Sequence, residues 1–117
     1  MKTTINKIAV IGSGVIGSGW TIRFLANKKI VNIYDPKETQ KKFLKSEIKR
    51  LSNSVLKFYK IKKLNLKNLH FKNSIKEAVQ DADLVQENAP ENIKIKKIII
   101  KEISQWTKKN SIIASSS

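Results

Sequence analysis

Residues 7–20 read KIAVIGSGVIGSGW, and this stretch decides how the chain folds. It opens with an apolar run, residues 7–11, whose length and β-branched composition are typical of a strand buried on both faces. All four glycines of the chain then lie together within residues 12–19. A helical stretch continues from this loop to Ala26. A strand, a glycine loop and a helix in this order predict a turn that binds phosphate groups.

The glycine spacing is G-x-G-x-x-G, and each glycine has its own expected role. We expect Gly12 to permit the tight turn off the strand and Gly14 to let a pyrophosphate approach the backbone. Gly17 should bring the helix close to the strand, and Gly19 should extend that close packing. A P-loop is excluded because no lysine follows the last glycine, and a tight turn without a ligand leaves the clustering of the glycines unexplained. The predicted cofactor contacts in the loop are Gly12, Ser13, Gly14, Val15, Ile16 and Gly17.

An acidic residue ends the second apolar run. Residues 30–34 (IVNIY) are predicted to form a strand, and Asp35 follows it at the spacing of the dinucleotide fingerprint. A carboxylate here accepts hydrogen bonds from the adenosine ribose and repels the 2′-phosphate of NADP. Taken alone, Asp35-Pro36 would indicate only a turn, but the glycine loop upstream favours the ribose contact. The predicted cofactor is therefore NAD.

The rest of the chain alternates between the periods of strands and helices. An apolar stripe in the helix predicted over residues 37–59 comprises Leu44, Ile48, Leu51, Val55 and Phe58. Further on we expect a loop at 60–68, a strand at 69–71, a helix opened by a capping box at Ser74 and Glu77, a strand at 83–87, a helix after Pro90 and a strand at 111–114. This alternation predicts an α/β fold, a Rossmann-type doubly wound parallel sheet of about five strands with helices on both faces. Residues 1–117 then form one NAD-binding domain.

Composition narrows the class of protein. The net charge is +15, but only Arg23 and Arg50 are arginine, and a nucleic-acid reader would use more of this residue. The chain has no cysteine and one histidine, His70, so we expect no metal site. The first apolar run is too short for a signal peptide or a membrane span. We therefore expect a cytoplasmic protein with neither nucleic acid nor membrane as partner.

Three stretches resemble the N-terminal domain of the 3-hydroxyacyl-CoA dehydrogenase family. They are residues 8–20 (IAVIGSGVIGSGW), residues 82–91 (ADLVQENAPE) with Lys96 after them, and residues 112–117 (IIASSS). Many dinucleotide enzymes share the first stretch, whereas the second and third are more specific. Ser116 stands where the acyl-CoA members have Asn, which points to the carnitine dehydrogenase branch of the family.

The resemblance implies an NAD-dependent oxidoreductase that oxidises the 3-hydroxyl of a small-molecule substrate, carnitine or a 3-hydroxyacyl-CoA, to a ketone. It implies that Glu91 and Lys96 line the nicotinamide side of the cofactor site. It also implies that the catalytic His and its partners lie beyond residue 117, together with a C-terminal substrate and dimerisation domain. His70 is not this base, because it lies in or beside the third strand. The parent enzyme is then a homodimer, and this chain alone should be inactive.

Three hypotheses follow. The first is a truncated dehydrogenase that supplies the cofactor half of the enzyme. The second is a stand-alone NAD-binding module that another chain completes, which predicts NAD binding without turnover. The third is a basic nucleic-acid binder, which predicts a steep dependence of oligonucleotide affinity on salt. The placement of the glycines favours the first two.

Overall fold

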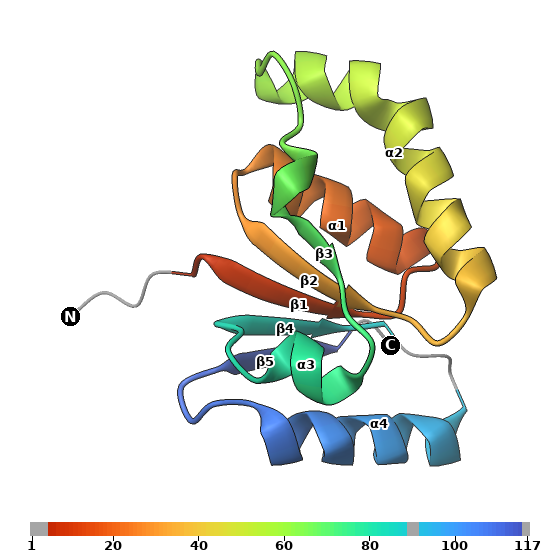
Figure 1. Ribbon diagram of the computed structural model, residues 1–117, viewed down its shortest axis with the longest axis vertical. Coiled ribbons are helices and arrows are strands. Elements are labelled where there is room, and N and C mark those ends of the chain that lie inside the picture. The colour runs from red at the N-terminus through yellow and green to blue at the C-terminus, as the bar shows by residue number, and fades with distance from the viewer. Residues whose placement is uncertain (1–4, 89–91, 116–117) are drawn as a thin grey trace.

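The computed structural model describes residues 5–88 and 92–115. Its five strands form one parallel sheet in the order β3-β2-β1-β4-β5, with helices on either side (Figure 1). The strands are β1 (Lys7–Ile11), β2 (Ile30–Tyr34), β3 (Leu69–Phe71), β4 (Leu84–Glu87) and β5 (Ile112–Ser115). The helices are α1 (Val15–Ala26), α2 (Glu38–Tyr59), α3 (Ile75–Val79) and α4 (Ile93–Trp106), with a short 3₁₀ helix η1 at Leu66–Asn68. The predicted doubly wound α/β fold is confirmed.

The first strand forms the centre of the sheet. Residues 8–11 of β1 are all buried, because β2 and β4 flank this strand and helices cover both of its faces. In register, Ile11 lies opposite Tyr34 of β2 and Glu87 of β4. The chain runs outward from β1 through β2 to β3 and then returns to β4 on the other side. This reversal of strand order opens a crevice at the carboxyl ends of β1 and β4.

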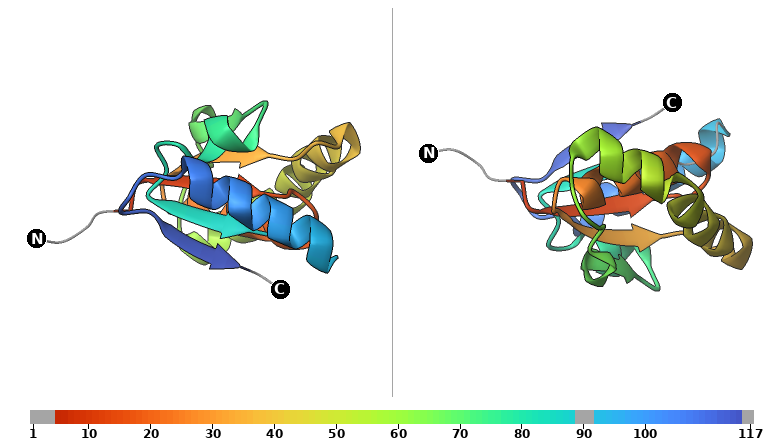
Figure 2. Two further views of the ribbon diagram at one scale, coloured as in Figure 1. Left: turned by 90° about the horizontal axis from the view of Figure 1, so that it is seen from below. Right: turned by 90° about the horizontal axis from the view of Figure 1, so that it is seen from above.

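Two apolar cores lie on opposite faces of the sheet. Figures 1 and 2 show the helices that cover these faces. Helices α1 and α2 cover one face, where Leu25 and Leu44 pack against β1 and β2. Helices α3 and α4 cover the other, where Val79 and Ile103 pack against β1 and β4. The helices therefore bury apolar side chains against the sheet, and α2 does so at Leu44 and Ile48 of the stripe that its sequence predicts.

Side chains cap the two helices on the second face. The hydroxyl of Ser74 accepts a hydrogen bond from the backbone N–H of Glu77 at 3.1 Å, as the capping box predicts. The carboxylate of Glu77 turns back to the N–H of Asn73, one residue before the usual partner. The side chain of Asn92 accepts from the N–H groups of Lys94 and Ile95 and so begins α4.

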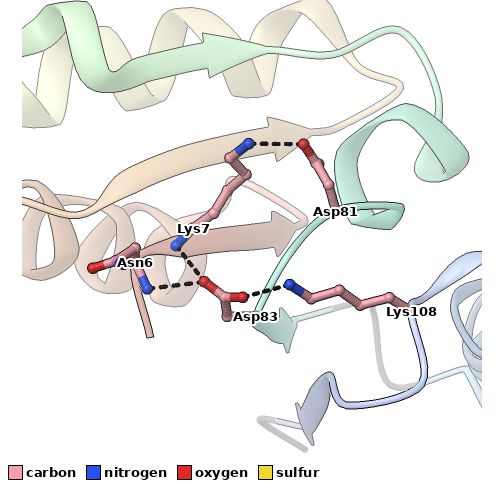
Figure 3. A network of polar contacts seen from close by, with 5 residues as sticks. All are labelled: Asn6, Lys7, Asp81, Asp83 and Lys108. Atoms are coloured by element: carbon pink, nitrogen blue, oxygen red, sulfur yellow. Dashed lines mark hydrogen bonds and ion pairs between the residues drawn. The ribbon is translucent and has the colours of Figure 1, made fainter. Parts of the chain in front are cut away.

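A carboxylate ties the amino ends of the central strands together (Figure 3). Oδ2 of Asp83 accepts hydrogen bonds from the backbone N–H groups of Asn6 and Lys7, at 2.9 and 3.0 Å. Its Oδ1 lies 2.6 Å from Nζ of Lys108, which precedes β5. A second pair joins Nζ of Lys7 to Asp81 at 2.7 Å. Asp83 thus fixes β1, β4 and the approach to β5 at the edge opposite the crevice.

Some apolar residues lie outside the cores. The stripe expected on α2 is buried at Leu44 and Ile48, but Phe58 at its end is 79% exposed, so its assignment to the stripe was wrong. Phe58 is the penultimate residue of α2, and its ring meets the ring of Tyr59 edge-on, with centroids 5.0 Å apart, while neither core includes it. On β5, Ile112 and Ile113 are both exposed. No helix in the described part of the chain is long and apolar enough to cross a membrane.

Candidate functional site

A pocket of about 440 Å³ lies at the carboxyl edge of the sheet, in the crevice beside β1. Its polar part comes from the glycine loop, the end of β2 and the start of α2, namely Gly12, Gly14, Asp35, Lys37 and Gln40. Its apolar part includes Ile75 of α3 and Ile95 and Ile99 of α4. The pocket therefore combines an apolar wall with Gly12, Gly14 and Asp35, three of the residues that the sequence predicted for a cofactor site.

The loop after β1 needs glycine at two positions for steric reasons. Gly12 has φ +96°, a left-handed conformation that side chains other than glycine rarely adopt. A Cβ on Gly17 would lie 1.8 Å from the carbonyl oxygen of Gly12, so the first turn of α1 could not pack against the loop. These positions confirm the tight turn and the close helix packing that the spacing predicts. Gly19 differs, because a Cβ there would meet no atom within 4 Å, so the role that we expected for it was wrong.

Asp35 holds the glycine loop to the end of β2. Its Oδ2 accepts a hydrogen bond from the backbone N–H of Ser13 at 2.9 Å, and its Oδ1 accepts one from the N–H of Lys37 at the same distance. Ser13 is buried, and its carbonyl accepts the hydroxyl of Ser18 at 2.8 Å. Oδ2 also accepts the Ser13 hydroxyl at 3.4 Å, whereas Oδ1 keeps a second lone pair, so Asp35 retains acceptor capacity.

The start of α1 faces the pocket with backbone groups rather than side chains. Gly14 is the N-cap, and no side-chain hydrogen bond caps the helix there. The N–H groups of the first turn have no helical carbonyl to bind, and they carry the positive end of the helix dipole. A Cβ on Gly14 would lie 3.7 Å from Nε2 of Gln40, which is an ordinary contact distance, and would meet no other atom within 4 Å. The space next to the Cα of Gly14 is therefore open. Val15 and Ile16 follow with exposed side chains.

The two residues expected on the nicotinamide side have different outcomes. Glu91 lies outside the described residues, as does Ser116 of the serine run. Lys96 lies on α4, and its Nζ is 3.3 Å from Oε1 of Glu87, the last residue of β4. The hydroxyl of Ser115 on β5 donates to the same oxygen at 2.7 Å. Ile95 and Ile99, neighbours of Lys96 on α4, line the pocket.

Three pocket-side residues were not predicted. Gln40 lies in the first turn of α2, and no spacing rule distinguishes it from the polar residues around it. The amide of Asn88 donates to the carbonyl of Gly12 at 3.4 Å, a contact between distant parts of the chain. Glu87 did leave a signal, because a carboxylate inside an apolar strand is rarely buried without a purpose. Among the described residues no group of three metal-ligating side chains comes together.

Residues 7–117 match the family model for the NAD-binding domain of 3-hydroxyacyl-CoA dehydrogenase. This chain belongs to that family. The L-carnitine dehydrogenase of Oceanobacillus iheyensis is 42% identical over 112 residues, which cover 96% of this chain and 36% of the relative. A 3-hydroxyacyl-CoA dehydrogenase of Gibberella moniliformis is 34% identical over the full chain and again 36% of the relative. The chain thus spans about a third of the length of the curated relatives that it matches.

Solved structures agree with this 3-hydroxyacyl-CoA dehydrogenase domain in fold. An NAD⁺-dependent 5-formyl-3-hydroxy-2-methylpyridine 4-carboxylic acid 5-dehydrogenase superposes with a TM-score of 0.81 at 30% identity, covering 97% of this chain and 37% of that one. The 3-hydroxybutyryl-CoA dehydrogenase of Escherichia coli K12 gives 0.82 at 24% identity, covering 98% of this chain and 25% of that one. The second likeness shows the fold alone.

The cofactor of the family is NAD, and the residues of this domain fit it. The open space next to Gly14 suits a pyrophosphate, because it adjoins the N-terminus of α1, where no side chain caps the backbone N–H groups. Asp35 lies on the same wall with free acceptor capacity, which suits a ribose diol. The predicted cofactor, family and fold are therefore confirmed.

Proposed function

We propose that this domain holds NAD(H) in the pocket at the carboxyl edge and presents it to a 3-hydroxy substrate of the full-length enzyme. The observation that carries the proposal is the placement of Gly14 and Asp35 on one wall of the pocket. When bound, the cofactor supplies a hydride acceptor for the oxidation of a hydroxyl to a ketone. L-carnitine and 3-hydroxyacyl-CoA are the proposed substrates, as the relatives' names suggest. We also propose that the full-length enzyme is a homodimer, as the resemblance implies.

The residues of this chain bind and orient in this scheme. The first-turn N–H groups of α1, together with the loop residues Gly12 to Gly17, contact the pyrophosphate. Asp35 accepts hydrogen bonds from the adenosine ribose while it continues to hold Ser13. Ile95 and Ile99 exclude water from the apolar side of the pocket. We place Glu91 and Lys96 on the nicotinamide side, and general-base chemistry on residues outside this chain.

The test is a calorimetric titration of the 117-residue chain with NAD⁺, with Gly14→Val as the disabled variant. The valine side chain would fill the open space next to Gly14 without a backbone clash, so the variant should fold. It should lose NAD⁺ binding, because the side chain occupies the place of the pyrophosphate. Gly19→Ala is the matched control, because its Cβ meets nothing within 4 Å. It should bind NAD⁺ as the wild type does. A folded wild-type chain that does not bind NAD⁺ would refute the proposal, as would a Gly14→Val variant that binds normally.

A further inference from the structure

Glu87 is a carboxylate at the carboxyl end of β4 whose side chain is fully buried. A lone ionised carboxylate in such a place would cost several kcal/mol of desolvation, so its partners decide its role. In register it lies beside Ile11, the last residue before the glycine loop. The residue that follows it, Asn88, lines the cofactor pocket. Glu87 therefore lies directly behind the wall of the pocket.

Oε1 of Glu87 joins three elements at this edge. It accepts the hydroxyl of Ser115 from β5 at 2.7 Å and pairs with Nζ of Lys96 from α4 at 3.3 Å. The hydroxyl hydrogen bond is short and well directed. The contact with Lys96 is an ion pair without the direction of a hydrogen bond, and Nζ has no hydrogen-bond partner among the described residues.

The buried ammonium of Lys96 therefore has N–H donors that no acceptor satisfies. Its Nζ is closed to solvent, and an ammonium carries three donors. Buried donors without acceptors are costly, and a ligand that brings an acceptor removes that cost. Ile95 and Ile99 of the same helix line the pocket, as does Asn88 next to Glu87, so a ligand in the part of the pocket beside α4 can bring such an acceptor.

We infer that Glu87 is a positioning residue, which holds the ammonium of Lys96 at the pocket so that it donates to the nicotinamide riboside half of NAD. This inference rests on the proposed function. Without the carboxylate, the long side chain of Lys96 would carry its charge out to solvent, as lysines at apolar surfaces do. Ser115 holds the carboxylate in turn, so α4, β4 and β5 share one fixed point. The other half of the cofactor, ADP, lies on the glycine loop and Asp35 and makes no use of this pair.

The experiment compares NAD⁺ with ADP, which lacks the nicotinamide riboside. Titrations use the wild type, Glu87→Gln, Lys96→Met and the double variant, each with its melting temperature recorded. We expect each single variant to lower the affinity for NAD⁺ by at least about tenfold, because each loses a hydrogen bond that involves a charged group, and such a bond contributes about this factor. The affinity for ADP should not change. The two effects on NAD⁺ should not add in the double variant, because both remove the same interaction.

The matched control is Lys97→Met, which removes an exposed lysine next to Lys96 on the same helix. This variant should bind both ligands with wild-type affinity. The control therefore separates the loss of one positive charge from the loss of the Lys96 contact. If Glu87→Gln does not fold, the titrations of the double variant replace those of Glu87→Gln, because the double variant leaves no unpaired buried charge and should fold.

Equal weakening of NAD⁺ and ADP binding, or unchanged NAD⁺ affinity with a lower melting temperature, would overturn the positioning role and leave a structural ion pair. In both of these results the wild type still binds, so the proposed function stands. A folded wild type that binds neither ligand would instead remove the proposed function, and this inference with it.

Discussion

Four glycines in one short loop have different surroundings, and only the structure separates them. Gly12 is required by its backbone conformation, Gly17 by a carbonyl that lies where a Cβ would be, and Gly14 by the ligand that we place above it. Gly19 shows none of these constraints. The spacing predicted the first three roles, because it reflects the geometry of a strand followed by a helix. It failed at Gly19, because a spacing rule contains no information on neighbouring atoms.

Replacement of Gly17 by alanine should destabilise the fold. Its Cβ would lie 1.8 Å from a backbone oxygen of Gly12, which cannot rotate away, so α1 must shift. We expect a loss of about 1–3 kcal/mol in the free energy of unfolding, measured by urea denaturation. Gly19→Ala should instead gain about 0.5–1 kcal/mol, since alanine favours the helix and meets no atom. Similar stability for the two variants would contradict the close approach seen at Gly17.

Replacement of Asp35 by asparagine should alter the choice between NAD⁺ and NADP⁺. The carboxylate lies where the adenosine ribose binds in our proposal, and its negative charge repels a 2′-phosphate. The variant should bind NAD⁺ about tenfold more weakly, because it loses charged hydrogen bonds. Its ratio of NADP⁺ to NAD⁺ affinity should rise. Calorimetric titration with both cofactors measures this ratio, and an unchanged ratio would show that Asp35 serves only to hold Ser13.

The strands were the easiest elements to predict, and contacts between elements were the hardest. The bounds of β1, β2 and β3 agree with the predicted runs because continuous apolar segments flanked by polar residues define buried strands. The 3₁₀ helix at Leu66–Asn68 was expected to be loop, since its stretch has no period. The contacts of Glu87 and Asn88 join residues far apart in the chain, so no local pattern contains them.

The amino ends of the strands depend on Asp83, and this makes stability dependent on pH. The side chain of Lys108 and the N–H groups of Lys7 and Asn6 hold the pKa of Asp83 well below its usual range. A carboxyl whose pKa is lower in the folded state stabilises the fold above its unfolded pKa, and this contribution is lost as pH falls. The wild type should therefore lose stability progressively below about pH 5.

Asp83→Asn tests this dependence. At pH 7 the variant should be less stable than the wild type by about 1–3 kcal/mol, because the backbone N–H groups lose a charged acceptor. The difference should shrink at pH 3, because the carboxyl of the unfolded wild-type chain is then largely protonated while that of the folded chain stays ionised. Urea denaturation at the two pH values measures it. Asp81→Asn is the control: this side chain is 56% exposed in its pair with Lys7, so its loss should cost less than about 1 kcal/mol at either pH.

At the scale of the molecule, one edge of the sheet is apolar and open. Ile112 and Ile113 on β5 are 50% and 41% exposed, and β5 pairs only with β4 among the described residues. An open apolar edge strand favours pairing with other chains even where the net charge is +15. We expect the 117-residue chain to self-associate as its concentration rises, and sedimentation velocity measures this.

Ile113→Lys should reduce this association, because a charged side chain on an edge strand opposes pairing. Phe58→Lys is the control, since it removes an apolar side chain that is 79% exposed but lies on α2, away from any strand edge. Association that falls equally in both variants would assign it to apolar area in general and not to the edge of the sheet.

The parallel sheet separates two tasks by the length of its strands. Asp83 and its partners Asn6, Lys7 and Lys108 hold the amino ends of the strands together, and the cofactor pocket lies at the carboxyl ends. Substitutions that strengthen the first edge therefore act at a distance from the second, and they need not trade affinity for robustness, as they often must when both depend on the same residues. A heat-tolerant version of this domain is best sought around Asn6, Asp81 and Lys108, where sequence change leaves the ligand's surroundings intact.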